Sequence, residues 1–332
     1  MRNKTKWLAY ATCAGMLLVL LMGALVTKTE SGRGCGDDWP LCNGKFVPAY
    51  TIESMIEWSH RFVTGIVGLL MLAATIQVLR RVRRADARFY VLWAAFFTVF
   101  QAMMGAFAVL WPQSSAVLAL HFGFSLLAFA GTLLLAIAVR EWAEQPDGGT
   151  NAGERKRESL ADDRGAAVSP GLKFGIWFVT VYCYVVVYIG AFVRHTESYA
   201  GCGGWPLCNG EWIPELSGAT GIMFGHRVAA LVLFILVALL YGTTRGLSGF
   251  SRTIRDACGW AFALIVLQVL SGAFVTFTLG SDWNLLASLL HTLLVSALFG
   301  VLSYLCALTV LSPGTARAAA ERAGFVRLGH KD

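Results

Sequence analysis

The stretch GALVTKTESGRGC (Gly23–Cys35) occurs a second time as GAFVRHTESYAGC (Gly190–Cys202), and the two copies align without a gap. Each copy runs into a loop that contains the letters WPLCNG, and the second loop is one residue shorter than the first. Further landmarks follow in the same order in both halves of the chain. We therefore interpret the chain as a tandem duplication of one structural unit.

The composition is that of a membrane protein. Hydrophobic residues make up 56% of the chain and charged residues only 14%, whereas about a quarter of the residues in soluble domains are charged. A helix needs roughly 20 apolar residues to cross the hydrocarbon layer, and the sequence offers eight such stretches. The predicted transmembrane helices are Trp7–Thr27, Met55–Leu79, Phe89–Trp111, Ala116–Val139, Phe174–Val193, Gly221–Tyr241, Ala257–Leu279 and Leu285–Val310.

The duplication and these helices together predict an all-α integral membrane fold, built as two tandem pseudo-symmetric four-helix bundles. Because an even number of helices separates equivalent positions, both halves are expected to run in the same direction across the membrane. The predicted boundaries are 1–140 for the N-terminal half, 141–171 for a polar cytoplasmic linker, 172–311 for the C-terminal half and 312–332 for a cytoplasmic tail.

The basic residues indicate the orientation. Most of the 27 Lys and Arg residues fall in loops on one side of the predicted helices, and cytoplasmic loops retain such residues, so both termini are predicted to be cytoplasmic. These loops lack the interleaved aromatic residues of a nucleic-acid surface, so lipid is the expected surrounding and no nucleic-acid partner is expected. The first apolar stretch is longer than the core of a cleavable signal, and no Arg- and Ser-rich presequence precedes it. We predict a multi-pass protein of a bacterial plasma membrane.

Four of the six histidines lie in or at the mouth of predicted transmembrane helices. Each half places one on its second helix and one on its fourth, near the outer end: His60 and His121, then His226 and His291. An ionisable side chain inside a membrane marks a functional site by default, although any one of these rings could instead be hydrogen-bonded to a neighbouring helix. Haem iron accepts one axial nitrogen from each side, whereas zinc prefers four converging ligands. The pattern predicts one haem pocket in each half.

Charged residues beside these histidines suggest further roles. Arg61 and Arg227 directly follow a histidine and are candidate contacts for haem propionates, with anchoring of the helix end at the lipid headgroups as an equal alternative. Glu57 lies one turn before His60 on the same helical face, and Met223 takes its place in the second half. This asymmetry indicates a difference in role: Glu57 could accept or relay protons beside a haem, or be a solvated acid at the positive end of the helix dipole.

The cysteines fall into two groups. Cys35 and Cys42 flank one outer loop and Cys202 and Cys208 the other, and an oxidising compartment favours a disulfide in each loop. An exposed disulfide can also exchange electrons, so a redox role for the first pair stays open, while the second pair is predicted to be structural. The other four cysteines are predicted to pack as small apolar residues: Cys13, Cys183, Cys258 and Cys306.

A glutamine followed one turn later by a glycine repeats in the third helix of each half, as Gln101 and Gly105 and as Gln268 and Gly272. Small residues let transmembrane helices approach closely, and an amide side chain can bond across to a neighbouring helix. The motif predicts a close interhelical contact with a hydrogen bond in both halves.

The duplicated four-helix unit, the paired cysteines around WPLCNG and the Glu57-xx-His60-Arg61 motif together resemble the haem A synthase family of cytochrome oxidase assembly. The resemblance covers both halves and leaves out only the linker and the tails. It implies an enzyme that oxidises the C8 methyl group of haem O to a formyl group by successive hydroxylations. It also implies haem O as the substrate, haem B as the cofactor, and a haem O synthase and an unidentified electron acceptor as partners.

Carried onto this sequence, the resemblance implies a role for each site residue. Glu57 would be the essential acid, and His60 and His121 would be the axial ligands of the haem O substrate. His226 and His291 would be the axial ligands of the iron in the haem B cofactor, which passes electrons on. Only the first half is then expected to carry out chemistry.

The resemblance also implies disulfides between Cys35 and Cys42 and between Cys202 and Cys208. Taken without it, the residues leave two other classes open. A di-haem b-type electron-transfer cytochrome would explain four histidines but not Glu57, and a haem carrier would bind haem without catalysis. The sequence leaves a homo-oligomer open as well.

Overall fold

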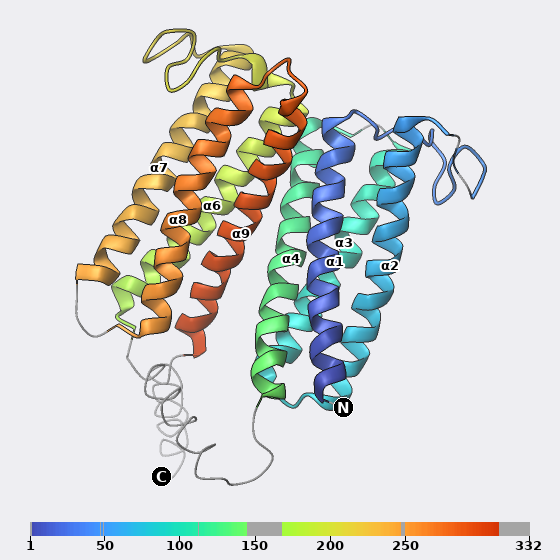
Figure 1. The fold of residues 1–332 in the computed structure, drawn as a ribbon, viewed down its shortest axis with the longest axis vertical. Coiled ribbons are helices and arrows are strands. Elements are labelled where there is room, and N and C mark those ends of the chain that lie inside the picture. The colour runs from blue at the N-terminus through green and yellow to red at the C-terminus, as the bar shows by residue number, and fades with distance from the viewer. Residues whose placement is uncertain are drawn as a thin grey trace, which may run out of the picture.

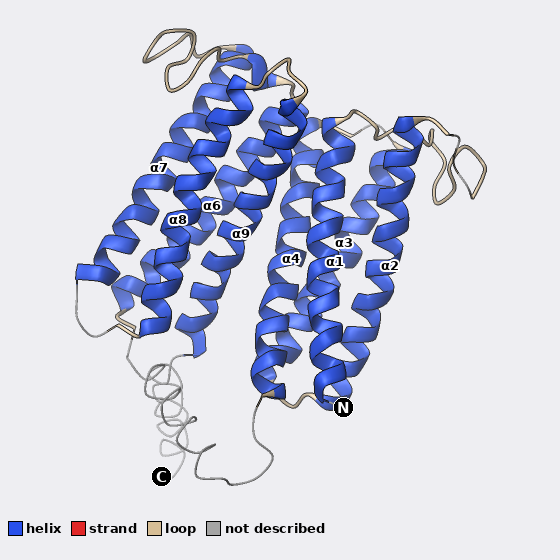
Figure 2. Cartoon of the chain, in the orientation of Figure 1, coloured by secondary structure: helices blue, strands red, loops and turns tan. Residues whose placement is uncertain are grey.

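A computed structural model describes residues 2–311 except 47, 49, 112, 145–167 and 247–249. Within this part eight α-helices are long and apolar enough to cross a membrane, and no strand is present (Figure 2). The helices are α1 (Arg2–Lys28), α2 (Ile52–Arg81), α3 (Ala85–Leu110), α4 (Ser115–Ala143), α6 (Pro170–His195), α7 (Gly218–Gly246), α8 (Arg252–Phe277) and α9 (Trp283–Leu311), with a short 3-10 helix η1 (Ser198–Ala200) after α6. The predicted all-α membrane fold is confirmed.

The helices are longer than the apolar stretches that predicted them. α2 begins at Ile52 instead of Met55, and α7 ends at Gly246 instead of Tyr241. The apolar stretch marks only the part of a helix inside hydrocarbon, whereas the backbone hydrogen bonds continue into polar turns that side chains can cap. Such caps are present at the starts of four helices, at Thr51, Ser114, Ser169 and Ser251.

Two helices extend into the predicted linker. α4 continues to Ala143 and α6 begins at Pro170, so both ends of the predicted linker (141–171) are helical. Most of that linker and the whole predicted tail (312–332) lie outside the described residues. Only α3 and α8 stop before their predicted ends, at Leu110 and Phe277, and in both a backbone N–H of the following residue still bonds back to the last turn.

The helices form two bundles side by side, α1–α4 and α6–α9 (Figure 1). In each bundle the first helix packs against the second and the fourth, and the third packs against the fourth. Between the bundles, α4 packs against α6 and α9, and α1 packs against α9. α1 begins and α9 ends at the same end of the protein, away from the cysteine loops (Figure 1). We call the opposite end, which carries the loops 34–44 and 201–210, the loop end.

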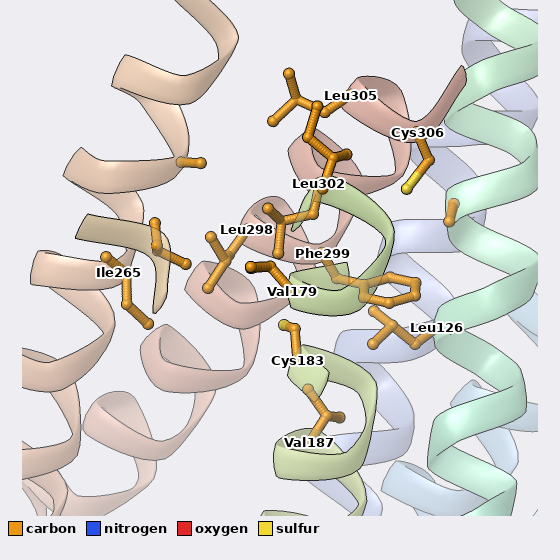
Figure 3. Close-up of a cluster of buried hydrophobic side chains, with 14 of the residues drawn as sticks. Leu126, Val179, Cys183, Val187, Ile265, Leu298, Phe299, Leu302, Leu305 and Cys306 are labelled. Atoms are coloured by element: carbon orange, nitrogen blue, oxygen red, sulfur yellow. The ribbon is translucent and has the colours of Figure 1, made fainter. Parts of the chain in front are cut away.

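An apolar core between α4, α6 and α9 joins the bundles (Figure 3). Leu126 of α4, Cys183 of α6 and Leu298 of α9 are fully buried in it. A small residue lets α4 and α6 approach, because a Cβ atom on Gly123 would lie 2.6 Å from the hydroxyl of Tyr184. In a membrane such close packing supplies the attraction between helices that the hydrophobic effect supplies in water. The two halves are therefore fixed to each other at mid-height.

A second contact joins the bundles at the loop end. Arg194 at the end of α6 donates from Nη2 to the backbone oxygen of Thr27 in α1, at 2.7 Å. The ring of Tyr199 in η1 attracts two cations, since Lys28 Nζ and Arg194 Cζ each lie 5.3 Å from its centroid. Thr27 and Gly32 stand in the first half where Arg194 and Tyr199 stand in the second. Arg194 and Tyr199, which make this junction, therefore differ from the residues at the equivalent positions of the first half.

Candidate functional site

The two cysteine loops share one backbone conformation. A disulfide closes each of them, between Cys35 and Cys42 and between Cys202 and Cys208. In each loop the second cysteine forms an isolated β-bridge three residues onward, and the asparagine after it has a positive φ, of 51° and 56°. Both loops also contain a cis Trp–Pro peptide bond. Both expected disulfides are therefore present, and the duplication extends to the loop structure.

One large cavity lies between the helices at the loop end. Its volume is about 1750 Å³, well above the roughly 300–1,000 Å³ of an ordinary small-molecule pocket. All four candidate histidine ligands, Glu57 and both candidate arginines line it. The sequence predicted a pocket in each half, whereas the structure has one continuous cavity with both histidine pairs in its wall. The junction between the bundles is part of the same wall, through Lys28 and Arg194.

Each of the four histidine rings packs against a glycine of the preceding helix. A Cβ atom added to the glycine would lie only 2.9–3.4 Å from the ring, in the pairs Gly23–His60, Gly105–His121, Gly190–His226 and Gly272–His291. The sequence predicted that the glycines of α3 and α8 bring helix backbones together. They instead make room for an imidazole, and those of α1 and α6 do the same. Because both glycines of each half are repeated, the duplication alone could have indicated this role.

Hydrogen bonding separates His291 from the other three rings. In those three, Nδ1 is buried and has no hydrogen-bond partner among the described residues. In His291, Nδ1 lies 2.8 Å from Ser271 Oγ, and that hydroxyl donates to the backbone oxygen of Gln268 at 2.9 Å. With its own proton directed to that carbonyl, the hydroxyl is placed to accept one from Nδ1, and the amide nitrogen of Gln268 lies 3.2 Å from Nδ1 and 3.0 Å from Nε2 of the same ring.

The glutamines of α3 and α8 make the predicted interhelical contacts, but with different partners. Gln268 Nε2 lies 3.0 Å from Nε2 of His291. Gln101 Nε2 lies 3.5 Å from the sulfur of Met16 in α1. Met104 takes the place of Ser271 in the first half, and a thioether has no proton to donate and accepts only weakly. The candidate ligands of the two halves are therefore supported differently.

Glu57 is a buried acid in the cavity wall. Only 3% of its surface is exposed, so the alternative of a solvated acid is wrong. Its Oε2 accepts the backbone N–H of Cys35 at 2.8 Å, and its Oε1 pairs with Nη2 of Arg61 at 2.5 Å. Glu30, which also lines the cavity, has a side chain that is 75% exposed. In the second half Met223 lines the cavity at the position of Glu57, so the asymmetry seen in the sequence lies at the site.

The two arginines bind the cysteine loops. Nη1 of Arg61 donates to the backbone oxygens of Asp38 and Leu41, each at 2.7 Å, and Nη1 of Arg227 donates to Leu207 at 2.9 Å. The Nε atom of each arginine is buried and has no partner in the described part of the chain. Each guanidinium therefore holds a loop over the cavity. From the sequence, the expected partners of these arginines were haem propionates or lipid headgroups. Their bonds to the cysteine loops were not predicted.

The disulfides lie behind the cavity wall. Cys35 and Cys202 have none of their surface exposed, and Cys42 and Cys208 have 1%. A redox role for the first pair would call for an exposed disulfide, whereas both cysteines of this pair are buried. Through its backbone N–H, however, the first loop touches the carboxylate of Glu57. The other four cysteines are buried or half-buried in helices and unpaired, as predicted.

The cavity fits a haem in three respects. Its wall is mostly apolar, two histidines of each bundle line it, and the glycines beside them leave space for the rings. Two axial nitrogens are sufficient for iron in a porphyrin. Among the described residues, no three His, Cys, Asp or Glu side chains converge as metal ligands.

Residues 6–54 and 49–303 match the COX15-CtaA family, whose members are described as cytochrome oxidase assembly proteins. The chain belongs to this family. The match includes both cysteine loops, the buried acid and all four histidines of the cavity. The resemblance suggested by the sequence motifs is confirmed, and the COX15-CtaA family assignment extends over both bundles.

Relatives match over nearly the whole chain. A protein from Symbiobacterium thermophilum named heme A synthase is 45% identical over 302 residues, which are 90% of this chain and 94% of that protein. Heme A synthases of Geobacillus kaustophilus and Alkalihalophilus pseudofirmus are 40% and 38% identical and cover 93% and 92% of this chain. Those matches take in 93% and 97% of the two relatives. With its eight membrane-length helices, this COX15-CtaA chain is a multi-pass protein of a bacterial plasma membrane.

Proposed function

We propose that this protein is a haem A synthase, an oxidoreductase that converts the C8 methyl group of haem O to the formyl group of haem A for cytochrome oxidase. Relatives along its whole length carry that name. The observation that carries the proposal is one cavity lined by two histidines of each half, in which Glu57 is the one buried acid among the described residues.

The substrate haem O is assigned to the first half, with His60 and His121 as its axial ligands. Turning a methyl into a formyl group takes electrons and protons from the carbon and adds oxygen, so the site needs a group that takes up or relays a proton. Glu57 lies one turn from His60 and faces the same cavity. Its two partners, Arg61 and the N–H of Cys35, fix the carboxylate, and each oxygen keeps a lone pair for a proton.

The cofactor haem B is assigned to the second half, with His226 and His291 as its ligands. When bound, haem B supplies a redox centre that accepts one electron at a time. Ser271 would accept a hydrogen bond from Nδ1 of His291 and so favour the tautomer with its lone pair on Nε2, and Met223 stands in this half at the position of the acid. An electron acceptor beyond the cofactor and a haem O synthase that delivers the substrate are the partners that this scheme requires.

The proposal is tested by expressing the chain in cells that make haem O but no haem A, and by identifying the extracted haems by mass. We expect a haem with the mass of the formyl product. If the purified protein binds haem normally but the cells hold only haems B and O, a di-haem b-type cytochrome would be the better description.

Replacing Ser271 by methionine, the residue of the first half, is expected to raise the reduction potential of the haem held by His291. A hydrogen bond accepted from Nδ1–H makes the imidazole a stronger ligand, and its loss disfavours the oxidised iron. The measurement is a potentiometric titration of the haem absorption band. The reciprocal Met104→Ser variant is the control and should leave this potential unchanged. An unaltered potential in Ser271→Met would show that the serine does not act on the ligand.

A further inference from the structure

The cavity wall differs between the halves along α2 and α7. When the two His-Arg pairs are aligned, Gly65 falls on Leu231 and Gly68 falls on Phe234. All four residues line the cavity. At these two equivalent places in the wall, the first half has glycines, which carry no side chain beyond a hydrogen atom. The second half has large apolar side chains there.

The space beside the two glycines is open. A Cβ atom on Gly65 or Gly68 would meet no described atom within 4 Å. In the second half the equivalent space is filled, because Phe234 packs on Phe262 of α8 with ring centroids 6.2 Å apart. Ala95 stands in the first half at the position of Phe262. In the second half these two rings pack between α7 and α8. The first half has neither ring at the equivalent positions of α2 and α3.

The cavity-lining side chains of the neighbouring helices also differ in size between the two halves. On α3, Ala102 lines the cavity where α8 has Val269. On α4 the differences run both ways, because Leu118 and Phe122 line the first half where α9 has a serine and a threonine, whereas Ser125 stands where α9 has Val295. At the positions named here α2 and α3 carry the smaller residue in the first half, so its free space lies against these two helices. The two halves are shaped for ligands with different substituents.

We propose that the open strip of α2 from Thr64 to Gly68 binds the long isoprenoid chain of haem O. This inference rests on the proposed function. Haem O carries the chain where haem B carries a vinyl group, so only the substrate half needs a place for it. The strip is free of charged residues and bordered by apolar ones, as such a chain requires.

The strip and the candidate iron ligand belong to one pocket. His60, Thr64 and Gly68 follow one another at intervals of one helical turn on the same face of α2, and all three line the cavity. The strip extends roughly 12 Å along the helix axis from the histidine. His60 itself has a buried Nδ1 without a partner among the described residues. A porphyrin held at His60 would therefore have a channel for its chain directly below it, toward the middle of the bundle.

The strip is open at its edge. Gly65 is exposed, and α2 lies on the outside of its bundle (Figure 1), where lipid surrounds the protein. A chain longer than the strip can continue into the hydrocarbon. Near the loop end, Trp58 and Phe62 are stacked with their ring centroids 5.2 Å apart and also line the cavity. They provide apolar surface between the candidate ligand and the lipid.

We expect the first half to prefer haem O over haem B only moderately. An isoprenoid chain outside the strip already lies in lipid, so binding gains little from the hydrophobic effect and depends on van der Waals contacts and shape. Filling the strip is different, because the chain would then collide with side chains, and forcing extra atoms into a packed site costs about 1–3 kcal/mol. Since 1.4 kcal/mol corresponds to a factor of ten, we expect a loss of about tenfold or more in haem O affinity.

The test is the double variant Gly65→Leu/Gly68→Phe, which copies the second half into the first. Both replacements favour the helix and meet open space, and haem B retained in the second half reports that the variant is folded. Wild type and variant are purified from cells without haem O and titrated with haem O and with haem B by absorption spectroscopy. We expect wild type to prefer haem O at the first half, and the variant to lose that preference while its haem B affinity changes little.

Ala73→Leu is the matched control, because it adds a leucine to an exposed position of α2 outside the cavity and should bind both haems as wild type does. Unchanged haem O affinity in the double variant would overturn the proposal, and so would an equal loss for both haems, since the replacements would then block the porphyrin itself. A wild-type protein that binds haem O selectively but forms no haem A in cells would refute the proposed function. It would still support the strip as the binding site of the isoprenoid chain.

Discussion

Replacing Glu57 by glutamine is expected to abolish haem A formation, with a loss of about 100-fold or more, while haem stays bound. Glutamine has the same size and can still accept the N–H of Cys35 through its amide oxygen. It carries no charge and takes up no proton, so the oxidation would stop although the pocket keeps its shape. The measurement is the ratio of haem A to haem O extracted from cells that express the variant.

A displaced loop could produce the same loss, because the carboxylate also pairs with Arg61. Arg61→Gln is the matched control. It breaks the same ion pair and removes two further bonds to the loop, but it leaves the acid in place. If Glu57 handles the proton, its variant loses much more product than Arg61→Gln, with the first disulfide intact in both by mass. Equal losses would mean that the acid serves only to hold the loop.

The fold could be predicted from the sequence because its determinants are local in the chain. Each transmembrane helix is a continuous apolar stretch, and the duplication is visible in the letters from Gly23 to Cys35 and from Gly190 to Cys202. The disulfides join cysteines only seven and six residues apart. The spacing of Glu57 and His60 places both on one face of a single helix. None of these features needs knowledge of how the bundles pack.

The parts of the site that the sequence did not predict depend on contacts between distant helices. The partner of Ser271 is on α9, twenty positions along the chain, and nothing in the sequence around Ser271 identifies it. The burial of Glu57 results from a loop that folds back so that Cys35 donates to it across 22 positions. The wall of the cavity also takes in the junction of the bundles at Arg194, where the first half has Thr27. Such contacts are set by tertiary packing.

Alanine substitutions in the two histidine pairs are expected to have different effects on bound haem B and on product formation. His226→Ala and His291→Ala should remove the haem B of the second half, and with it both the b-type absorption band and the product. His60→Ala and His121→Ala should remove the product but leave the haem B band, because the second pair is untouched. His195→Ala is the control, since its ring lines the same cavity while its position aligns with Lys28, and it should keep both haem B and product.

This pattern separates the proposed enzyme from its nearest alternative. In a di-haem b-type cytochrome, a substitution in either pair would remove one of two similar haem B signals, and haem O would not be needed for full occupancy. In the proposed synthase, only the second pair holds haem B, and the first pair determines whether haem O is bound. Glu57 and the strip from Thr64 to Gly68 both belong to the first half, so substrate binding must depend on His60 and His121. A haem B band lost from His60→Ala but kept in His226→Ala would reverse the roles of the halves and contradict the assignment.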